Sequence, residues 1–243
     1  MSSKKLFWPR VSPHFLACRR GVRAAALDHA VAVGLSGGAD SLALMAALVA
    51  EGHEVLALCV DHGLQDGSRA QAERAAEQAR KLGARARVLS VAAGAESMEA
   101  AARVARYRAL AAACADEGLE VAVAHTADDQ AETLLLGALR GRVTGMGERS
   151  EVEGARVVRP LLGVRRADTE GACAELGLSA WQDPQNADTN FRRVALRREV
   201  IPQLSRIIGG DAVPALAQAA GDAALDDAAR LDQVVREQLG RLK

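Results

Sequence analysis

Short apolar runs alternate with longer helical patterns along most of this chain. The runs 31–34, 55–60, 84–91 and 121–124 have strand length, and 156–162 predicts a fifth strand. Continuous apolar runs are typical of parallel strands that are covered on both faces. The alternation predicts an α/β fold with a parallel, doubly wound sheet, which is a Rossmann-like arrangement.

The stretches between these runs have helical character. We expect helices over 15–29, 42–50, 71–82, 96–114, 131–139, 165–176 and 191–204. The remainder predicts further helix with two Gly/Pro breaks. We therefore expect a basic N-terminal segment (1–30), a main α/β domain (31–205) and a short C-terminal helical segment (206–243).

Composition narrows the class of protein. The 243 residues are 49% apolar, enough for a sizeable core, and 31 basic residues balance 31 acidic ones. Basic residues are in excess over 1–30 and 140–206, whereas the region between is acidic. Such segments fit a polyanion partner and, equally, ordinary solvated arginines. The four cysteines are scattered and no apolar run has membrane-spanning length, which favours a reducing, cytoplasmic location without a membrane partner.

One glycine-rich stretch follows the first predicted strand and precedes a helix. It consists of Ser36, Gly37, Gly38, Ala39, Asp40 and Ser41. Strand, glycine turn and helix together direct backbone N–H groups at an anion, the serines add donors, and Ser41 is also a candidate helix cap. The Lys of a Walker A loop is missing. Asp40 instead indicates Mg²⁺ between carboxylate and phosphates, while a turn without a ligand is the alternative.

Polar residues also follow two other strands. His62 comes after the second strand, and His125 after the fourth. Asp129 and Glu132 are three residues apart at the start of the next helix, so they project together. They fit either a second carboxylate group facing Mg²⁺ and a triphosphate or simple complementation of the helix dipole. For each histidine, a structural role and a catalytic role are equally compatible with the sequence.

These motifs form an ordered series. They are Ser-Gly-Gly-Ala-Asp-Ser (36–41), Val-Asp-His-Gly-Leu (60–64), the segment 97–107, His-Thr-Ala-Asp-Asp-Gln-Ala-Glu-Thr (125–133), Arg-Pro-Leu-Leu (159–162) and Asp-Pro-Gln-Asn (183–186). The first resembles the PP-loop of the N-type ATP pyrophosphatases, which have an adenine nucleotide alpha hydrolase-like fold. The whole series resembles the tRNA(Ile)-lysidine synthetase family over most of 31–204.

The resemblance implies a ligase that uses ATP and Mg²⁺. The C2 oxygen of cytidine-34 in the CAU anticodon of tRNA(Ile) is adenylated, and the amine of L-lysine then displaces AMP to give lysidine. The resemblance places ATP at residues 36–41 and His62, and Mg²⁺ at Asp40 and Asp129. Arg106 would stabilise the α-phosphate, and Asp129 or Glu132 would receive the lysine amine or its proton. Candidates for RNA phosphates are Arg140, Arg142, Arg192, Arg193 and Arg197.

Two other functions fit the PP-loop. A tRNA cytidine thiolase would share it, but the scattered cysteines argue against sulfur chemistry. A nucleotide-binding domain without catalysis would not require the acidic residues Asp40, Asp129 and Glu132. The loop 141–147 is shorter than the family pattern, and a homodimer is a further expectation from the resemblance.

Overall fold

The computed structural model describes residues 8–9, 11–61, 63, 67–91 and 98–240. These residues form two compact units that interleave along the chain. The first comprises Met1–Thr126 and Glu148–Asp183, and the second comprises Ala127–Gly147 and Pro184–Lys243. Over the described helices, none has both the length and the hydropathy needed to cross a bilayer.

The first unit is built on a mostly parallel sheet. Its strands are β1 (Ala30–Gly34), β2 (Glu54–Asp61), β3 (Arg85–Ser90), β4 (Val121–Ala122), β5 (Arg149–Val152) and β6 (Ala155–Val158), in the order β3-β2-β1-β4-β6-β5. β1 pairs with both β2 and β4, so the strand order reverses between β1 and β4. Ligands of open α/β sheets bind beyond the carboxyl ends of the strands at such a reversal. The predicted fold class is confirmed.

One edge of the sheet departs from the expected all-parallel arrangement. β5 pairs antiparallel with β6 through a turn in which Glu153 and Gly154 have positive φ (50° and 79°). β5 carries one apolar residue, Val152, and the rest of the strand is exposed. The sequence therefore contains no hydrophobic run that would have predicted this strand. The fifth predicted strand is shorter than expected and ends at Val158.

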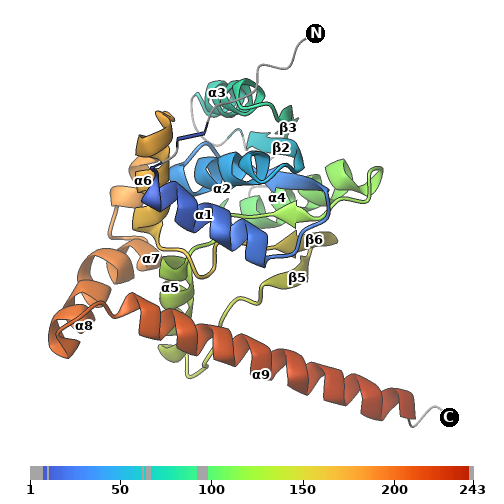
Figure 1. Ribbon diagram of the computed structural model, residues 1–243. Helices are drawn as coiled ribbons and strands as arrows, with labels where there is room; N and C mark the ends of the chain where they lie inside the picture. The colour runs from blue at the N-terminus through green and yellow to red at the C-terminus, as the bar shows by residue number, and fades with distance from the viewer. Residues whose placement is uncertain (1–7, 10, 62, 64–66, 92–97, 241–243) are drawn as a thin grey trace. The chain divides into compact units, whose positions relative to one another are not determined.

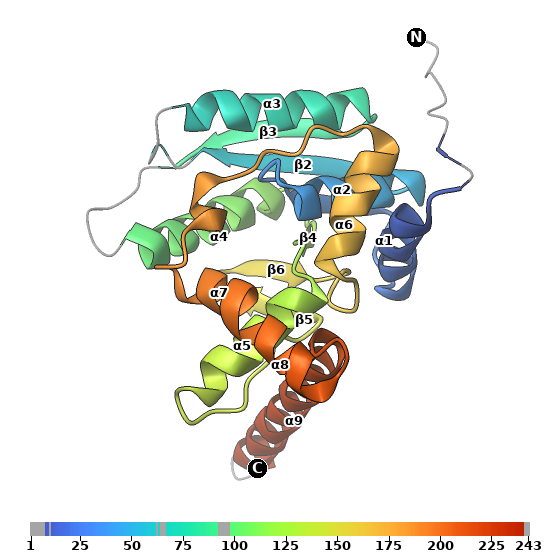
Figure 2. The same ribbon diagram turned by 90° about the vertical axis from the view of Figure 1, so that its left-hand side faces the viewer.

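Side chains alternate between two cores on opposite faces of the sheet. Val31 and Val33 belong to the core beneath α1 (Pro13–Ala24), α2 (Ala39–Ala50), α3 (Ser68–Lys81) and α6 (Arg166–Leu176). Ala32 belongs to the core beneath α4 (Met98–Ala115). Figure 1 shows α2 and α4 on opposite sides of the sheet, and Figure 2 shows α3 lying along β3 and β2.

The second unit is helical. It contains α5 (Ala127–Ala138), a 3-10 turn (Pro184–Ala187), α7 (Arg192–Ala195), a π-helical segment (Leu196–Val200), α8 (Ile201–Ile208) and α9 (Val213–Gly240). Ala127, Ala131, Ile201 and Val213 form its small core. Of the two breaks expected in the C-terminal region, only the one at Gly209 (φ 69°) occurs. The second is wrong because α9 continues without interruption from Val213 to Gly240.

Candidate active site

The turn between β1 and α2 has the geometry of an anion-binding loop. β1 ends at Gly34, and α2 begins at Ala39 with Gly38 as the N-cap (φ −73°, ψ 164°). Because the first amides of a helix have no acceptor within the helix, this end of α2 presents N–H groups and the positive end of the helix dipole. The turn therefore offers the donors that a phosphate group requires.

Two serine hydroxyls brace this turn. The Oγ atoms of Ser36 and Ser41 lie 3.1 Å apart, Ser41 Oγ donates to the Gly38 carbonyl oxygen at 3.0 Å, and the Gly38 N–H donates to Ser36 Oγ at 3.3 Å. The expectation that Ser41 caps α2 is wrong, because Gly38 takes that position and Ser41 lies within the first turn.

Position 37 requires glycine for two reasons, its backbone conformation and the close approach of Gln71. Its φ of +85° lies in the left-handed region, where side chains are disfavoured. A Cβ atom there would also lie 2.6 Å from Nε2 of Gln71 on α3. Gln71 is buried, and Arg74 fixes its amide by donating to Oε1 at 2.8 and 3.1 Å. Helix α3 thus shapes the back of the loop, a role that the sequence did not reveal.

Asp40 lies in the first turn of α2 and faces α6. Its Oδ1 accepts a hydrogen bond from the Thr169 hydroxyl, and its Oδ2 lies 3.5 Å from Arg166 Nε. The side chain of Asp40 remains 29% exposed, so the carboxylate is accessible from solvent. Mg²⁺ binds through one or two carboxylates together with phosphate oxygens, and the donor chemistry at Asp40 fits this preference. Among the described residues, no three His, Cys, Asp or Glu gather into a protein-only metal site.

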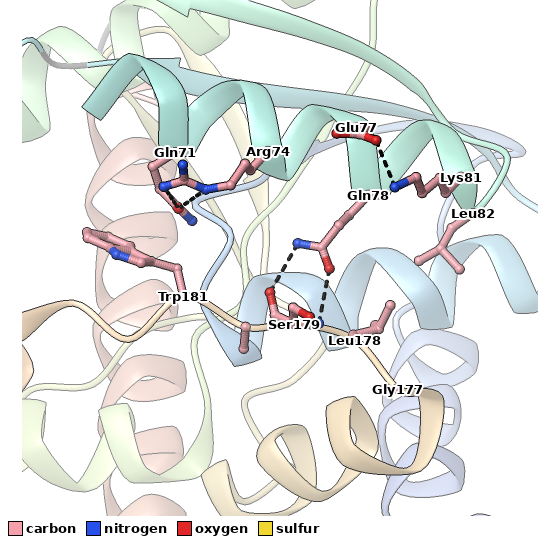
Figure 3. A pocket seen from close by; sticks show the side chains of 11 residues that line it. Gln71, Arg74, Glu77, Gln78, Lys81, Leu82, Gly177, Leu178, Ser179 and Trp181 are labelled. Carbon is pink, nitrogen blue, oxygen red and sulfur yellow. Dashed lines mark hydrogen bonds and ion pairs between the residues drawn. The ribbon is translucent and has the colours of Figure 1, made fainter. Parts of the chain in front are cut away.

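A groove of about 530 Å³ runs between α3 and residues 177–181, which follow α6 (Figure 3). Gln78 bridges its two walls, donating to the Ser179 carbonyl oxygen at 3.1 Å and accepting from the Ser179 N–H at 3.2 Å. At one end, the Trp181 N–H donates to the Gly37 carbonyl oxygen at 2.8 Å. The segment after α6 therefore supports the loop directly.

Further motif residues of the first unit lie at or just after the end of β2 or on α4. Asp61, at the end of β2, accepts from the Gly63 N–H (3.0 Å) and Ser68 Oγ (2.6 Å), so it links the end of β2 to the first residue of α3. His62 lies outside the described residues. Arg106 stacks on the ring of buried Tyr107, with Cζ 5.5 Å from the ring centroid, and burial lowers the pKa of its guanidinium. A desolvated cation of this kind interacts strongly with an anionic ligand.

In the second unit, one buried carboxylate joins two predicted RNA-binding residues. Glu132 is fully buried; Arg197 Nε donates to its Oε1 at 2.7 Å, and Arg193 Nη1 donates to its Oε2 at 3.4 Å. Arg193 also donates to Thr133 Oγ1 at 3.2 Å. Both oxygens of Glu132 therefore have arginine partners. Asp129, one turn earlier on α5, is partly exposed.

The loop after α5 is held by contacts with α5 and with α9. Buried Gln130 donates from Nε2 to the Met146 carbonyl oxygen and accepts from the Met146 N–H, both at 2.8 Å. At Gly145, a Cβ atom would lie 1.8 Å from the carbonyl oxygen of Ala220 on α9, so only glycine fits. This loop carries Arg140 and Arg142. Both arginines are exposed, as is Arg192 at the start of α7.

Three features define the class of this protein: the glycine-rich loop, the reversal of strand order beside β1, and the N-terminus of α2. The PP-loop domain family matches residues 18–204, so the chain is a PP-loop protein. A U34-tRNA thiolase, NcsA from Methanococcus maripaludis, solved with its [4Fe-4S] cluster, has the same fold. It superimposes with a TM-score of 0.67 over 90% of this chain and 87% of its own, at 18% sequence identity.

Curated relatives narrow the class to one family. The tRNA(Ile)-lysidine synthase of Corynebacterium glutamicum is 55% identical over 219 residues, which cover 90% of this chain and 68% of that protein. The tRNA(Ile)-lysidine synthase of Corynebacterium diphtheriae is 58% identical over 214 residues, covering 88% and 70% respectively. The chain belongs to the tRNA(Ile)-lysidine synthase family.

Proposed function

We propose that this chain is a ligase that converts cytidine-34 of the CAU anticodon of tRNA(Ile) to lysidine, consuming ATP and L-lysine. The observation that carries the proposal is 55–58% identity to tRNA(Ile)-lysidine synthases over most of the chain. The braced PP-loop supports it, because a chain that only folds like a PP-loop protein would not need Gly37, the two serines and Asp40 in this arrangement.

The first step forms an adenylate. The C2 oxygen of cytidine attacks the α-phosphorus of ATP, and the bond to the bridging oxygen breaks, so that pyrophosphate leaves. We assign the phosphates to the N-terminal amides of α2 and to Ser36 and Ser41, whose donors are already ordered. Arg106 supplies positive charge to the α-phosphate as its negative charge increases. A Mg²⁺ ion held by Asp40, and by Asp129 in our proposal, would neutralise phosphate charge.

The second step replaces AMP by lysine. The ε-amine, after losing a proton, attacks C2, and the C2–O bond breaks to release AMP. We assign binding of the ammonium group and acceptance of its proton to Asp129, because it is partly exposed whereas Glu132 is fully buried between two arginines. Glu132 then acts by orienting Arg193 and Arg197.

The RNA substrate requires contacts to its phosphates. Arg140, Arg142 and Arg192 are exposed and carry no ion pair among the described residues, so they are our first candidates. Arg193 and Arg197 are second candidates, since their side chains are 44% and 29% exposed although Glu132 pairs with both. An unstacked anticodon base is accessible to such a site. Cytoplasmic location and a homodimer complete the proposal.

The cysteines argue against the alternative of tRNA thiolation. Burial raises the pKa of the Cys18, Cys59 and Cys173 thiols to about 12 and that of Cys114 to about 11. The thiolate is the reactive and metal-binding form, and burial disfavours it at all four positions. Similarity to the thiolase NcsA at 18% identity reflects the shared fold.

One assay tests the proposal. The protein is incubated with ATP, Mg²⁺, labelled lysine and unmodified tRNA(Ile) with a CAU anticodon; a tRNA with uridine at position 34 is the matched control. Lysine incorporation with release of AMP and pyrophosphate is the expected result for the first tRNA alone. ATP turnover without lysine incorporation would favour another PP-loop tRNA-modifying reaction, and absence of turnover would favour a nucleotide-binding domain.

A further inference from the structure

In the second unit, a buried glutamine on α5 holds the loop that follows this helix. The chain turns back after α5 and forms this loop over residues 139–147 (Figure 2). Gln130 is only 3% exposed although its side chain is an amide, so both polar ends of the amide need partners. Met146 provides both: Gln130 Nε2 donates to its carbonyl oxygen and Gln130 Oε1 accepts its N–H, each at 2.8 Å. One side chain therefore ties the end of the loop to α5.

The loop also packs against α5 two turns further along the helix. Gln130 and Gly137 are seven residues apart, so they lie on the same face of α5. A Cβ atom at Gly137 would lie 2.8 Å from the carbonyl oxygen of Arg142 and closer still to the Thr144 hydroxyl. The backbone N–H groups of Arg140 and Arg142 donate to the Gly137 carbonyl oxygen at 2.8 and 2.9 Å. The loop backbone therefore follows one face of α5.

The base of the loop is held on both sides, whereas its tip is exposed. At Gly145 a Cβ atom would meet the backbone of Ala220 on α9, so the base lies between α5 and α9. Residues 139–143 form the tip, in which Leu139 is 77% exposed and Val143 is 66% exposed. An exposed tip on a base that packing and hydrogen bonds hold in one conformation is a pre-organised binding element, because less conformational freedom is lost when a partner binds.

The tip carries charge of one sign. Arg140 and Arg142 are the only ionisable residues of 139–143, and both are exposed. Within the part of the chain that the structure describes, neither guanidinium has an ion pair. Guanidinium groups form strong, charge-assisted hydrogen bonds with phosphate oxygens, so the tip fits the backbone of a nucleic acid.

We propose that Gln130 is a positioning residue that holds the loop in the conformation in which Arg140 and Arg142 contact the phosphates of the tRNA. The inference rests on the proposed function, which assigns RNA contacts to these two arginines. Gln130 is buried and touches no RNA, so it acts only through the loop backbone. Its replacement by methionine retains the approximate volume but removes the amide, which leaves both backbone groups of Met146 without this partner.

The test measures tRNA binding by the full chain. Fluorescence anisotropy with unmodified tRNA(Ile) carrying a CAU anticodon gives the Kd at several salt concentrations. We expect Gln130→Met to weaken binding about 10-fold and to reduce the slope of log K against log [salt] by about one to two. Gln78→Met is the matched control, because Gln78 makes the same pair of hydrogen bonds with the backbone of Ser179 in the first unit. This control should leave the salt slope at the wild-type value.

A mutant cycle separates positioning from damage to the fold. In a chain that already carries Arg140→Gln and Arg142→Gln, Gln130→Met should cause no further loss of tRNA affinity, because the groups that it places are absent. In steady-state kinetics the KM for tRNA should rise while the KM for ATP stays constant. A full additive loss in the arginine background, or an unchanged salt slope in Gln130→Met alone, would overturn the inference. If circular dichroism shows that the methionine variant does not fold, Gln130→Ala takes its place in the same cycle.

The outcomes also separate this inference from the proposed function. A wild-type chain that does not bind tRNA(Ile) would remove the proposed function and the inference together. A wild-type chain that binds this tRNA and incorporates lysine, while Gln130→Met binds it equally well, would overturn the role of Gln130 alone. Lysine incorporation with unchanged affinity in the variant that lacks both arginines would exclude the tip as an RNA contact and leave the reaction in place.

Discussion

The PP-loop and the acidic start of α5 both looked like sites in the sequence, yet the structure treats them differently. In the PP-loop, Ser36, Gly38 and Ser41 contact one another within six residues of chain. At α5, the partners of Glu132 are Arg193 and Arg197, more than sixty residues away. A function carried by local backbone can be inferred from local sequence, whereas a charge takes its role from whatever the fold places beside it.

The comparison also separates two kinds of arginine–glutamate group. Glu132 is fully buried between Arg193 and Arg197 in the second unit. Glu51, at the end of α2 in the first unit, pairs with Arg19 and Arg23 and keeps 12% of its side chain exposed. The composition of the two groups is the same, so burial alone should set how much each contributes to stability.

The largest effect should come from the PP-loop. Asp40→Asn should lower pyrophosphate release by about 100-fold or more, because the residue assigned to phosphate neutralisation loses its charge. Circular dichroism should show an unchanged fold, since the amide can still accept the hydrogen bond from Thr169. Turnover close to wild type would show that Asp40 has no part in the reaction.

Glu132→Gln should reduce the stability of the fold rather than act directly on catalysis. We expect a loss of about 2 kcal/mol in the free energy of unfolding, reduced from the value for a wholly buried pair because Arg193 is 44% exposed. Denaturant unfolding measures it, and the KM for lysine is measured in parallel. An unchanged unfolding free energy with a raised KM would instead place Glu132 at the lysine amine.

The exposed arginines should act through charge. Arg140→Gln and Arg142→Gln should each weaken tRNA binding and reduce the slope of log K against log [salt] by about one. Fluorescence anisotropy at several salt concentrations gives both values. Arg108→Gln is the matched control, because Arg108 is also exposed but pairs with Glu153 at 2.9 Å. A salt slope that the loop variants leave unchanged would exclude phosphate contacts there.

Glu51 should show the smallest effect and a pH signature. Burial raises the pKa of Glu51, but hydrogen bonds from Arg23 and Arg19 outweigh it and the pKa is lowered overall. Its stabilisation is therefore present above the ordinary glutamate pKa of 4.5 and is lost as pH falls through the lowered value. Glu51→Gln should cost about 1 kcal/mol at pH 7. The difference from wild type should vanish in acid; a constant difference would contradict this account.

The sequence was sufficient for the fold class and for the position of the glycine-rich loop between the first strand and its helix, whereas the order of the strands came from the structure. An apolar strand, two glycines shortly after it and a helical pattern of apolar residues after those together specify an anion-binding turn. All of these signals lie within about twenty residues of one another. The hydrogen bond from Thr169 of α6 to Asp40 could not be found in this way. Thr169 and Asp40 are 129 residues apart, and nothing in the pattern of α6 distinguishes a threonine that orients a carboxylate from an ordinary buried one.

Other residues were missed for related reasons. Gln130 lies inside a recognised motif, but its partner is the backbone of Met146, which has no side-chain signature. Gln71 was read only as the start of a helix, although its amide lies against Gly37. β5 was missed because an exposed edge strand needs few apolar residues.

The contact of Gly145 with Ala220 has a consequence for how this enzyme family can vary. A loop that meets the long helix at backbone level cannot change length without a matching change in the helix surface. Chimeras that graft a loop of a different length onto this scaffold should therefore fold only when the facing stretch of α9 is exchanged as well. The two segments, distant in sequence, are therefore packed as a single unit.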